Sequence, residues 1–506
     1  MRRLLALVVF GYLTGRPLSA QAPGPLDAAA ETITPAVLLT RIAILADDSM
    51  LGRDTPSPGL ERAVRYVSGE FRRLGLEPAG DRGTYVQRFG VSRWRVDTAT
   101  SSLELSGRGA RARVAFGSGV RVIGGGVSGK PVAGDAVLVA GPITGAVAKD
   151  ARLRGKVVLL VPDFSQPLPF DLGERVDEIA GAARAVILLS NRDSTTFSRR
   201  IDTALEPRLT PDYRDAEDGA PVVEVREGAL GSVATVAALD LGQLRSLDST
   251  VIREVRDLRV DLRIARQYLE RAMAPNLVAV LEGRDPEFRD EYVAISAHLD
   301  HVGVRPGRPD SIFNGADDNA SGVAGLLALA EAFSRRDARP ARSLLFVVPS
   351  GEEKGLWGSA YWVRHPTVPL GKVVADLNMD LIGRNWTDSV IVTGPDMSTL
   401  GETLRRVTAR HAELRMAPVA DRWPEERIFY RSDHYNFALR GVPVLFFTSG
   451  THSDYHQPTD VTEDIDTEKA SRLVRYVFHI GAAVANDLDR PRWHPGSYER
   501  LLEEQQ

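Results

Sequence analysis

The chain has 506 residues, of which 43% are hydrophobic and 26% are charged. This is the ordinary balance of a globular protein, and the length predicts two or three domains rather than one core. A net charge of −4 without any basic block argues against nucleic acid as a partner. Cysteine is absent, which excludes disulfides and thiolate metal ligands.

The first 22 residues have the pattern of an export signal. Two arginines precede an apolar run over residues 4–13, and small residues follow at 18–22. The run is too short to span a bilayer, which needs roughly 20 residues, and no later stretch is long enough. The alternative is an uncleaved N-terminal anchor. We expect an exported bacterial protein, periplasmic or extracellular, without a stable membrane span.

The regions that follow differ in amino-acid composition and in expected secondary structure. Residues 23–35 are rich in Ala and Pro and predict a loose leader, and residues 36–76 predict helices. From about 100 to 265, short β-rich runs are separated by Gly and Pro, with one helix expected over residues 174–185. Gly124-Gly125-Gly126 is not followed by a phosphate-loop or dinucleotide pattern, which favours an ordinary loop. The region therefore predicts an inserted β-rich domain.

From about residue 275 onward, strands and helices alternate. Near-continuous apolar runs predict strands at 276–281, 292–297, 343–348, 373–377 and 442–447, and helical periodicity predicts helices at 320–333 and 467–486. Alternation of this kind predicts an α/β fold with a doubly wound, mostly parallel sheet flanked by helices.

This region contains five short segments with side chains that can bind metal, and four of them directly follow predicted strands. They are His298-Leu299-Asp300, Gly315-Ala316-Asp317-Asp318-Asn319, Glu352-Glu353, Asn378-Met379-Asp380 and Tyr455-His456-Gln457-Pro458-Thr459-Asp460. Histidine and carboxylate ligands without a thiol suit a hydrolytic zinc pair. Ligands bind beyond the carboxyl ends of strands in open α/β sheets, so we expect these segments to converge.

Each segment also has a plainer interpretation. Asp317 and Asp318 could cap a helix, although Asn319 or Ser321 could do so instead. Glu352-Glu353 could be a solvated acidic turn, and His301 could equally lie at the surface or behind a ligand. An unpaired Asp380 at the end of a buried strand would be costly. The presence of all five segments together, four of them at strand ends, favours the metal site.

Three longer motifs resemble those of the co-catalytic zinc peptidases, a family that includes secreted bacterial aminopeptidases and glutamate carboxypeptidases. They are Asn314–Gly322, Ser350–Ser359 and Arg431–Tyr435. The resemblance covers residues 36–486 and implies two zinc ions. It places the metal ligands at His298, Asp318, Glu353, Asp380 and His456, with Asp318 as the bridge. It also implies a general base at Glu352, an orienting role for Asp300, and a cis Asp318–Asn319 peptide.

The resemblance also implies an organisation for the chain. Residues 23–104 and 263–490 would form the zinc peptidase domain, and residues 105–262 would be an inserted protease-associated domain. Residues 491–506 would then be a C-terminal tail. The sequence does not indicate an oligomeric state.

We therefore expect a secreted two-zinc exopeptidase that acts on peptides, most simply an aminopeptidase. His434, Arg431 and Tyr430 are candidate substrate-binding residues. One alternative is a carboxypeptidase of the glutamate carboxypeptidase type, and another is a non-catalytic binding protein on the same fold. A serine hydrolase is disfavoured because the chain has no G-x-S-x-G motif.

Overall fold

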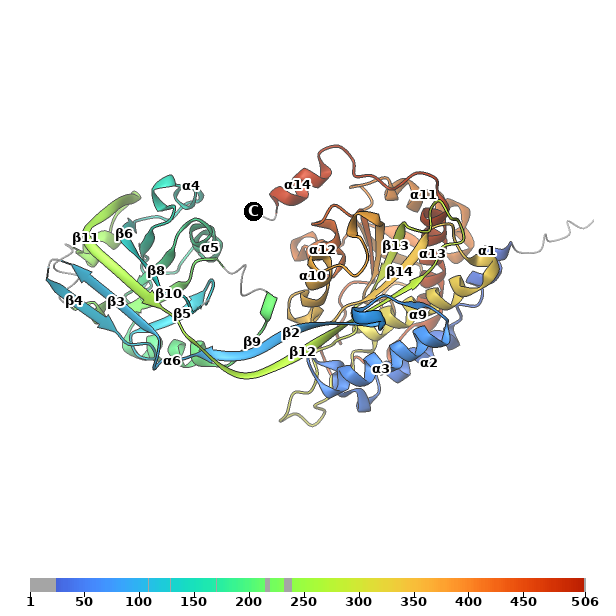
Figure 1. The fold of residues 1–506 in the computed structure, drawn as a ribbon, viewed down its shortest axis with the longest axis horizontal. Helices are drawn as coiled ribbons and strands as arrows, with labels where there is room; N and C mark the ends of the chain where they lie inside the picture. Colours follow the sequence, from blue (N-terminus) through green and yellow to red (C-terminus); the bar gives the residue numbers. More distant parts are fainter. Residues whose placement is uncertain are drawn as a thin grey trace, which may run out of the picture.

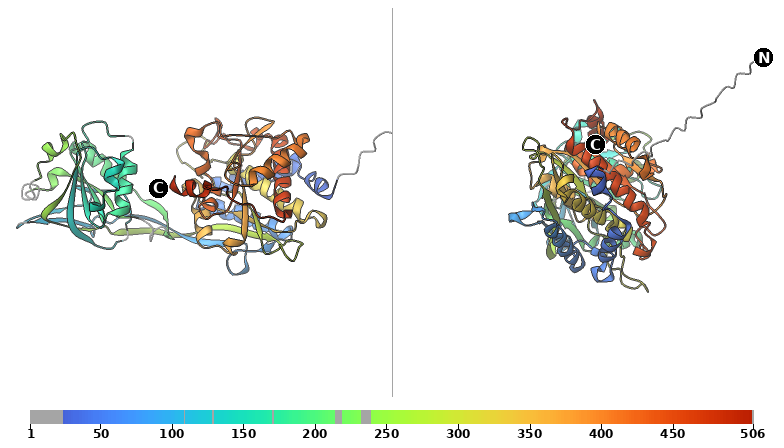
Figure 2. Two further views of the ribbon diagram at one scale, coloured as in Figure 1. Left: turned by 90° about the horizontal axis from the view of Figure 1, so that it is seen from above. Right: turned by 90° about the vertical axis from the view of Figure 1, so that its right-hand side faces the viewer.

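The computed structural model describes residues 24–504 except 108, 128, 170, 214–218 and 232–238. The predicted export signal lies outside these residues. Figure 1 shows two lobes joined by a pair of long strands, β2 (Val86–Val96) and β12 (Arg266–Leu281). Figure 2 shows the same elongated arrangement from above. Within the described ranges, no helix is both long and apolar enough to cross a membrane.

The larger lobe is built on a ten-stranded sheet. Its four central strands are parallel, as the apolar runs predict: β18 (Val444–Thr448), β15 (Val373–Met379), β13 (Tyr292–Ser296) and β14 (Ser343–Val348). Beyond β14 the order continues antiparallel through β12, β2 and β9 (Arg208–Pro211), and β1 (Glu77–Pro78) also pairs with β12. Beyond β18 lie β16 (Ser389–Thr393), which is antiparallel to it, and β17 (Ala417–Val419).

Helices cover both faces of this sheet, which is the predicted doubly wound arrangement. Val293 and Ile295 of β13 point to one face, whereas Ala294 points to the other. The first face is covered by α1 (Pro25–Ala30), α2 (Pro35–Leu45), α3 (Pro58–Arg73), α9 (Gly322–Ser334), α11 (Leu400–Arg410) and α13 (Thr467–Asn486). The second is covered by α10 (Trp357–Arg364), α12 (His434–Ala438) and α14 (Ser497–Glu503).

Both ends of the described chain differ from expectation. Residues 23–35 were expected to be a loose leader, but in the described part, residues 24–35, α1 and the turn after it bury Ala29, Ala30 and Ile33 against the main core. At the other end, α14 buries Leu501, and Trp493 Nε1 donates a hydrogen bond to the Gly441 carbonyl at 2.8 Å. Hydrophobic burial therefore draws both segments onto the larger lobe.

The smaller lobe holds an eight-stranded sheet formed by residues 102–263. Its order is β4 (Ala110–Val114), β3 (Ser102–Gly107), β11 (Val251–Arg263), β6 (Val132–Ala140), β7 (Val157–Val161), β8 (Ala185–Ser190), β10 (Val222–Arg226) and β5 (Val120–Gly124). The helix expected at 174–185 is α5 (Leu172–Ala182), and its predicted last residue instead opens β8. Besides α5, the lobe contains α4 (Gly145–Ala148), α6 (Ser194–Leu205) and α8 (Leu241–Arg245), so the expectation of a single helix was wrong.

Candidate metal centre

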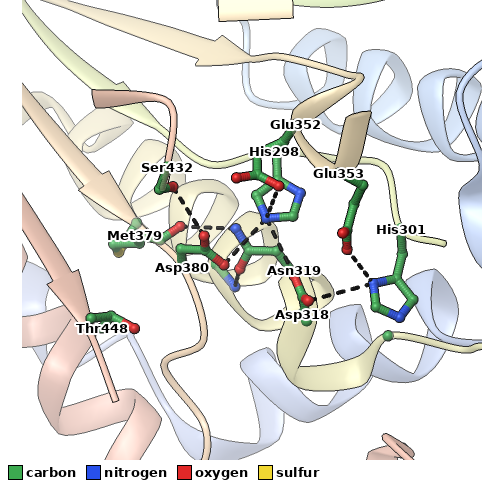
Figure 3. A network of polar contacts seen from close by, with 12 residues as sticks. His298, His301, Asp318, Asn319, Glu352, Glu353, Met379, Asp380, Ser432 and Thr448 are labelled. Carbon is green, nitrogen blue, oxygen red and sulfur yellow. Dashed lines mark hydrogen bonds and ion pairs between the residues drawn. The ribbon is translucent and has the colours of Figure 1, made fainter. Parts of the chain in front are cut away.

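The predicted side chains gather at one edge of the larger sheet. His298 follows the end of β13, Glu352 and Glu353 follow β14, Asp380 directly follows β15, and His456 lies in the loop after β18. These four strands are parallel, so their carboxyl ends share one edge. Asp318 reaches the same place from the turn before α9, as Figure 3 shows.

The first group of donor atoms consists of His298, Asp318 and Asp380. His298 Nε2 lies 3.4 Å from Asp318 Oδ1 and 3.2 Å from Asp380 Oδ1. All three side chains are buried. Asp380 is held from its other oxygen by the Ser432 hydroxyl, which donates to Oδ2 at 3.0 Å. One imidazole and two carboxylates therefore face a common point.

The second group shares Asp318 with the first. His456 Nε2 lies 3.1 Å from Asp318 Oδ2 and 2.9 Å from Glu353 Oε2. His301 joins this group, because its Nδ1 lies 2.8 Å from Glu353 Oε1 and 3.7 Å from Asp318 Oδ2. The two oxygens of Asp318 thus face different donor groups, which is the geometry of a bridging carboxylate.

The turn that carries Asp318 is fixed by buried polar groups. Gly315 adopts a left-handed conformation with φ of 61°, and the Asp318–Asn319 peptide is cis, as the resemblance implies. Asp460 Oδ2 accepts hydrogen bonds from the backbone N–H groups of Asp317 and Asp318, each at 3.1 Å. The loop is therefore anchored on both sides of the shared carboxylate.

Arg53 supports this site structurally, and no sequence motif points to it. Its buried guanidinium donates to the carbonyls of Leu299, Asn314 and Gly315 at 2.7–2.8 Å. These carbonyls belong to the two loops that carry His298 and Asp318. No local pattern identifies such a residue, because these three partners lie 246, 261 and 262 positions away in the chain.

The electrostatics of the site favour bound cations. Burial lowers the pKa of His456, but the carboxylates of Asp318 and Glu353 outweigh it and raise the pKa to about 10. Burial also raises the pKa of Glu352 well above its usual value, and the carboxylates of Asp380 and Glu353 add to this increase. A surplus of buried carboxylates is costly unless cations balance it.

The donor set fits zinc. Imidazole nitrogens and carboxylate oxygens are both zinc ligands, and the chain supplies no thiolate. His456 Nε2 forms no hydrogen bond with the described residues, although it lies within 3.1 Å of two carboxylate oxygens. A nitrogen directed at the space between carboxylates suits a metal ligand better than a hydrogen-bond donor.

Glu352 and Asp300 lie beside the first donor group. Glu352 Oε2 is 4.0 Å from His298 Nε2, and the Glu352 backbone N–H donates to Asp300 Oδ1 at 3.2 Å. His298 Nδ1 contacts the backbone carbonyl of Asp300 at 3.1 Å, whereas the nearest carboxylate oxygen is 3.8 Å away. Asp300 can therefore orient His298 through its backbone and the Glu352 loop through its side chain.

A small cavity of about 40 Å³ opens onto the first donor group. Its acidic lining is Asp318, Glu352 and Asp380, and its other lining residues are Leu381, Ile428, Arg431, Phe446, Thr448, Gly450, Thr451 and Tyr455. The cavity lining thus combines three carboxylates with the apolar side chains of Leu381, Ile428 and Phe446 and with several polar groups.

The three candidate substrate-binding residues lie in different environments. Arg431 lines the cavity but is exposed and pairs with Glu426 at 2.9 Å. His434 is fully buried and stacks on Phe446 with ring centroids 4.5 Å apart, and burial lowers its pKa to about 3. The Tyr430 hydroxyl donates to Glu504 instead of lining the cavity. Only Arg431 is placed to meet a ligand.

The fold and these converging donor groups define an α/β protein with a candidate metal-binding site at the carboxyl edge of its sheet. Residues 276–480 match the family described as Peptidase family M28. This match covers residues 276–480 and leaves the rest of the chain outside it.

Curated relatives match parts of the chain. A probable zinc metalloprotease of Pyricularia oryzae is 38% identical over 109 residues, which is 21% of each chain. Leupeptin-inactivating enzyme 1 of Streptomyces exfoliatus is 31% identical over 181 residues, or 36% of each chain. The matched region thus spans well under half the length of either relative. Among solved structures, an aminopeptidase from Aneurinibacillus sp. strain AM-1 has a TM-score of 0.49 and 18% identity, covering 92% of this chain and 99% of that one.

Proposed function

We propose that this chain is an exported, two-zinc exopeptidase that removes N-terminal residues from peptides. The observation that carries the proposal is the pair of donor groups that share Asp318, with Glu352 beside the first of them. One ion would be held by His298, Asp318 and Asp380, and the other by Glu353, His456 and the second oxygen of Asp318. Bound zinc would supply Lewis-acid polarisation of a carbonyl and a lowered pKa for water.

Glu352 is the proposed proton carrier. It belongs to neither donor group, it lines the cavity, and burial holds its pKa well above the usual value. A carboxylate in this position can accept a proton from attacking water and return it to the departing amine nitrogen. Asp300 supports this step as a positioning residue, through its hydrogen bond from the Glu352 backbone N–H.

The charges around the cavity favour recognition of an amine over a carboxylate. Three carboxylates line the cavity, whereas Arg431 is its one cationic lining residue among those described, and Glu426 already pairs with it. Arg384, another candidate for binding a terminal carboxylate, is paired with Asp454 at 2.5 Å. The apolar lining formed by Leu381, Ile428 and Phe446 suits the first side chain of a substrate.

A pair of blocked peptides tests this proposal. Acetylation of the N-terminus of a test peptide should abolish cleavage, whereas amidation of its C-terminus should leave cleavage intact. Metal analysis of the same sample should give two zinc ions per chain. The opposite blocking pattern would identify a carboxypeptidase, and absence of cleavage by a fully loaded protein would identify a binding protein.

We further propose that residues 105–262 are a protease-associated domain that shapes the approach to the site. In support, the described strands within residues 102–263, apart from β9, form their own sheet, and every member of the two converging donor groups lies outside residues 105–262.

A further inference from the structure

We propose that His301 is the fourth protein ligand of the second zinc ion, so that this ion is closed to substrate and the first ion alone stays open. The inference rests on the proposed two-zinc function and deepens it by assigning different tasks to the two ions. It makes His301 a metal-ligating residue, beyond the five ligands that the family motifs indicate.

The distances within the second group suit four ligands around one ion. Zinc bonds of about 2.0–2.1 Å in a tetrahedron place ligand atoms about 3.3–3.4 Å apart. Asp318 Oδ2 lies 3.7 Å from His301 Nδ1 and 3.1 Å from His456 Nε2, which brackets the expected value. Glu353 faces the two imidazoles with different oxygens, Oε1 at 2.8 Å from His301 Nδ1 and Oε2 at 2.9 Å from His456 Nε2. With one donor atom taken from each residue, the four donor atoms lie within 4.8 Å of one another.

The orientation of the His301 ring supports the same assignment. The ring is fully buried, and its Nδ1 faces the two carboxylates, as Figure 3 shows. Its other nitrogen, Nε2, has no hydrogen-bond partner among the described residues. The rings of His301 and His456 meet edge-on at 75°, with centroids 5.5 Å apart, so their nitrogens can approach one point without stacking. The polar contacts that fix the ring are therefore those made by Nδ1.

The cavity distinguishes the two groups. It is lined by Asp318, Asp380 and the neighbouring Glu352, whereas Glu353, His301 and His456 are absent from its lining. Catalytic zinc sites keep one position open, and structural sites have four protein ligands. The first group has three protein donors and faces the cavity, so it has the character of the open site. The second group, with His301, has four and has the character of the closed one.

This division predicts how the two ions bind. The second site should fill first, because it offers two imidazoles and one more protein ligand. X-ray absorption of wild-type protein loaded with one equivalent of zinc should therefore show two imidazole ligands per ion. One imidazole per ion in this sample would overturn the assignment.

Substitution of His301 gives a test that does not depend on activity. His301→Ala should weaken the tighter of the two zinc dissociation constants by more than about 100-fold, beyond the 10–100-fold loss expected for a residue that only supports a ligand. His301→Asn retains a group that can donate to Glu353 but is a poor zinc ligand. Asn should therefore behave like Ala, and recovery of wild-type affinity by Asn would reduce His301 to a supporting role.

His452→Ala is the matched control. His452 is buried beside the same loop, with Nε2 3.4 Å from Asp317 Oδ2, but belongs to neither donor group. The His452→Ala variant should keep both zinc dissociation constants within a few-fold of wild type. An equal loss of zinc affinity in His452→Ala and His301→Ala would mean that His301 acts only through folding. Failure of the wild type to bind two ions would refute the proposed function itself. Two bound ions that are insensitive to His301 would refute this inference alone.

Discussion

At the residue scale, the side chains that form the two donor groups are distinct from Glu352, the residue that we propose transfers a proton. Asp318 faces both donor groups, through Oδ1 toward His298 and Oδ2 toward His456. Glu352 faces the cavity but belongs to neither group. Substitutions at these two positions should therefore fail in different ways.

Replacement of Glu352 should lower the rate of catalysis without loss of bound zinc. We expect Glu352→Gln to bind two zinc ions with wild-type affinity while kcat falls by about 10²–10⁴-fold, because an amide cannot accept the proton from water. Metal analysis and steady-state kinetics on the same sample measure both quantities. Glu353→Gln is the neighbouring comparison and should instead lose metal. Near-normal turnover by Glu352→Gln would require another base.

Replacement of the shared carboxylate should weaken both ions. Asp318→Asn removes the charge that both donor groups use, so both zinc dissociation constants should rise. His456→Ala should raise only one of them, because His456 contacts the second group alone. Competition with a chromophoric chelator resolves the two constants. An Asp318→Asn protein that still holds one ion at wild-type affinity would contradict the shared role.

At the element scale, α13 and the end of α11 meet through two stacked histidines. The rings of His411 and His479 lie 3.7 Å apart at 16°, and His479 is almost fully buried. Burial, together with the neighbouring His411, lowers the pKa of His479 to about 4. This pair lies away from the converging donor groups, so it affects stability and not catalysis.

This shift gives a pH dependence with a defined sign. The folded pKa of about 4 lies below the ordinary value of 6.5, so the unfolded chain binds more protons between these values. Stability from this group is therefore complete above pH 6.5 and is lost as the pH falls toward 4, by on the order of 1–2 kcal/mol after allowance for screening. His479→Gln should show a smaller loss of unfolding free energy between pH 7 and 4.5. An unchanged pH profile would mean that His479 does not contribute.

The same scale shows what the sequence could predict. The apolar runs located β13, β14 and β15, and the predicted helix at 467–486 coincides with α13. The convergence of the donor residues could be predicted from their positions after these strands, because the carboxyl ends of parallel strands lie at the same edge of a sheet. The role of Arg53 and the inward orientation of His301 could not be predicted, since each depends on contacts between distant loops. Likewise, β9 is too short to show the alternation that would assign it to the larger sheet.

At the scale of the whole molecule, the smaller lobe is not independent of the larger one. Its sequence range supplies β9, which pairs with β2 in the larger sheet. Just after β9, the Tyr213 hydroxyl donates to the Trp357 carbonyl at 2.8 Å, and its ring lies 5.4 Å from that of Tyr361. Trp357 in turn lies against Gly351, the residue before Glu352. A chain of contacts therefore connects the segment after β9 to the loop that carries Glu352.

This connection predicts a kinetic effect without a change in metal content. Tyr213→Ala removes the ring and its hydrogen bond at the start of α10, so the Glu352 loop should be held less accurately. Small displacements of catalytic groups can cost up to about 100-fold in rate, and we expect kcat to fall by about tenfold while both zinc ions remain bound. Tyr213→Phe should lose less, because it keeps the ring. Tyr268→Ala is the control, since Tyr268 is exposed on β12 away from this contact and should not change kcat. If Tyr213→Ala and Tyr268→Ala had the same kcat, the insertion would not influence the catalytic loop through Tyr213.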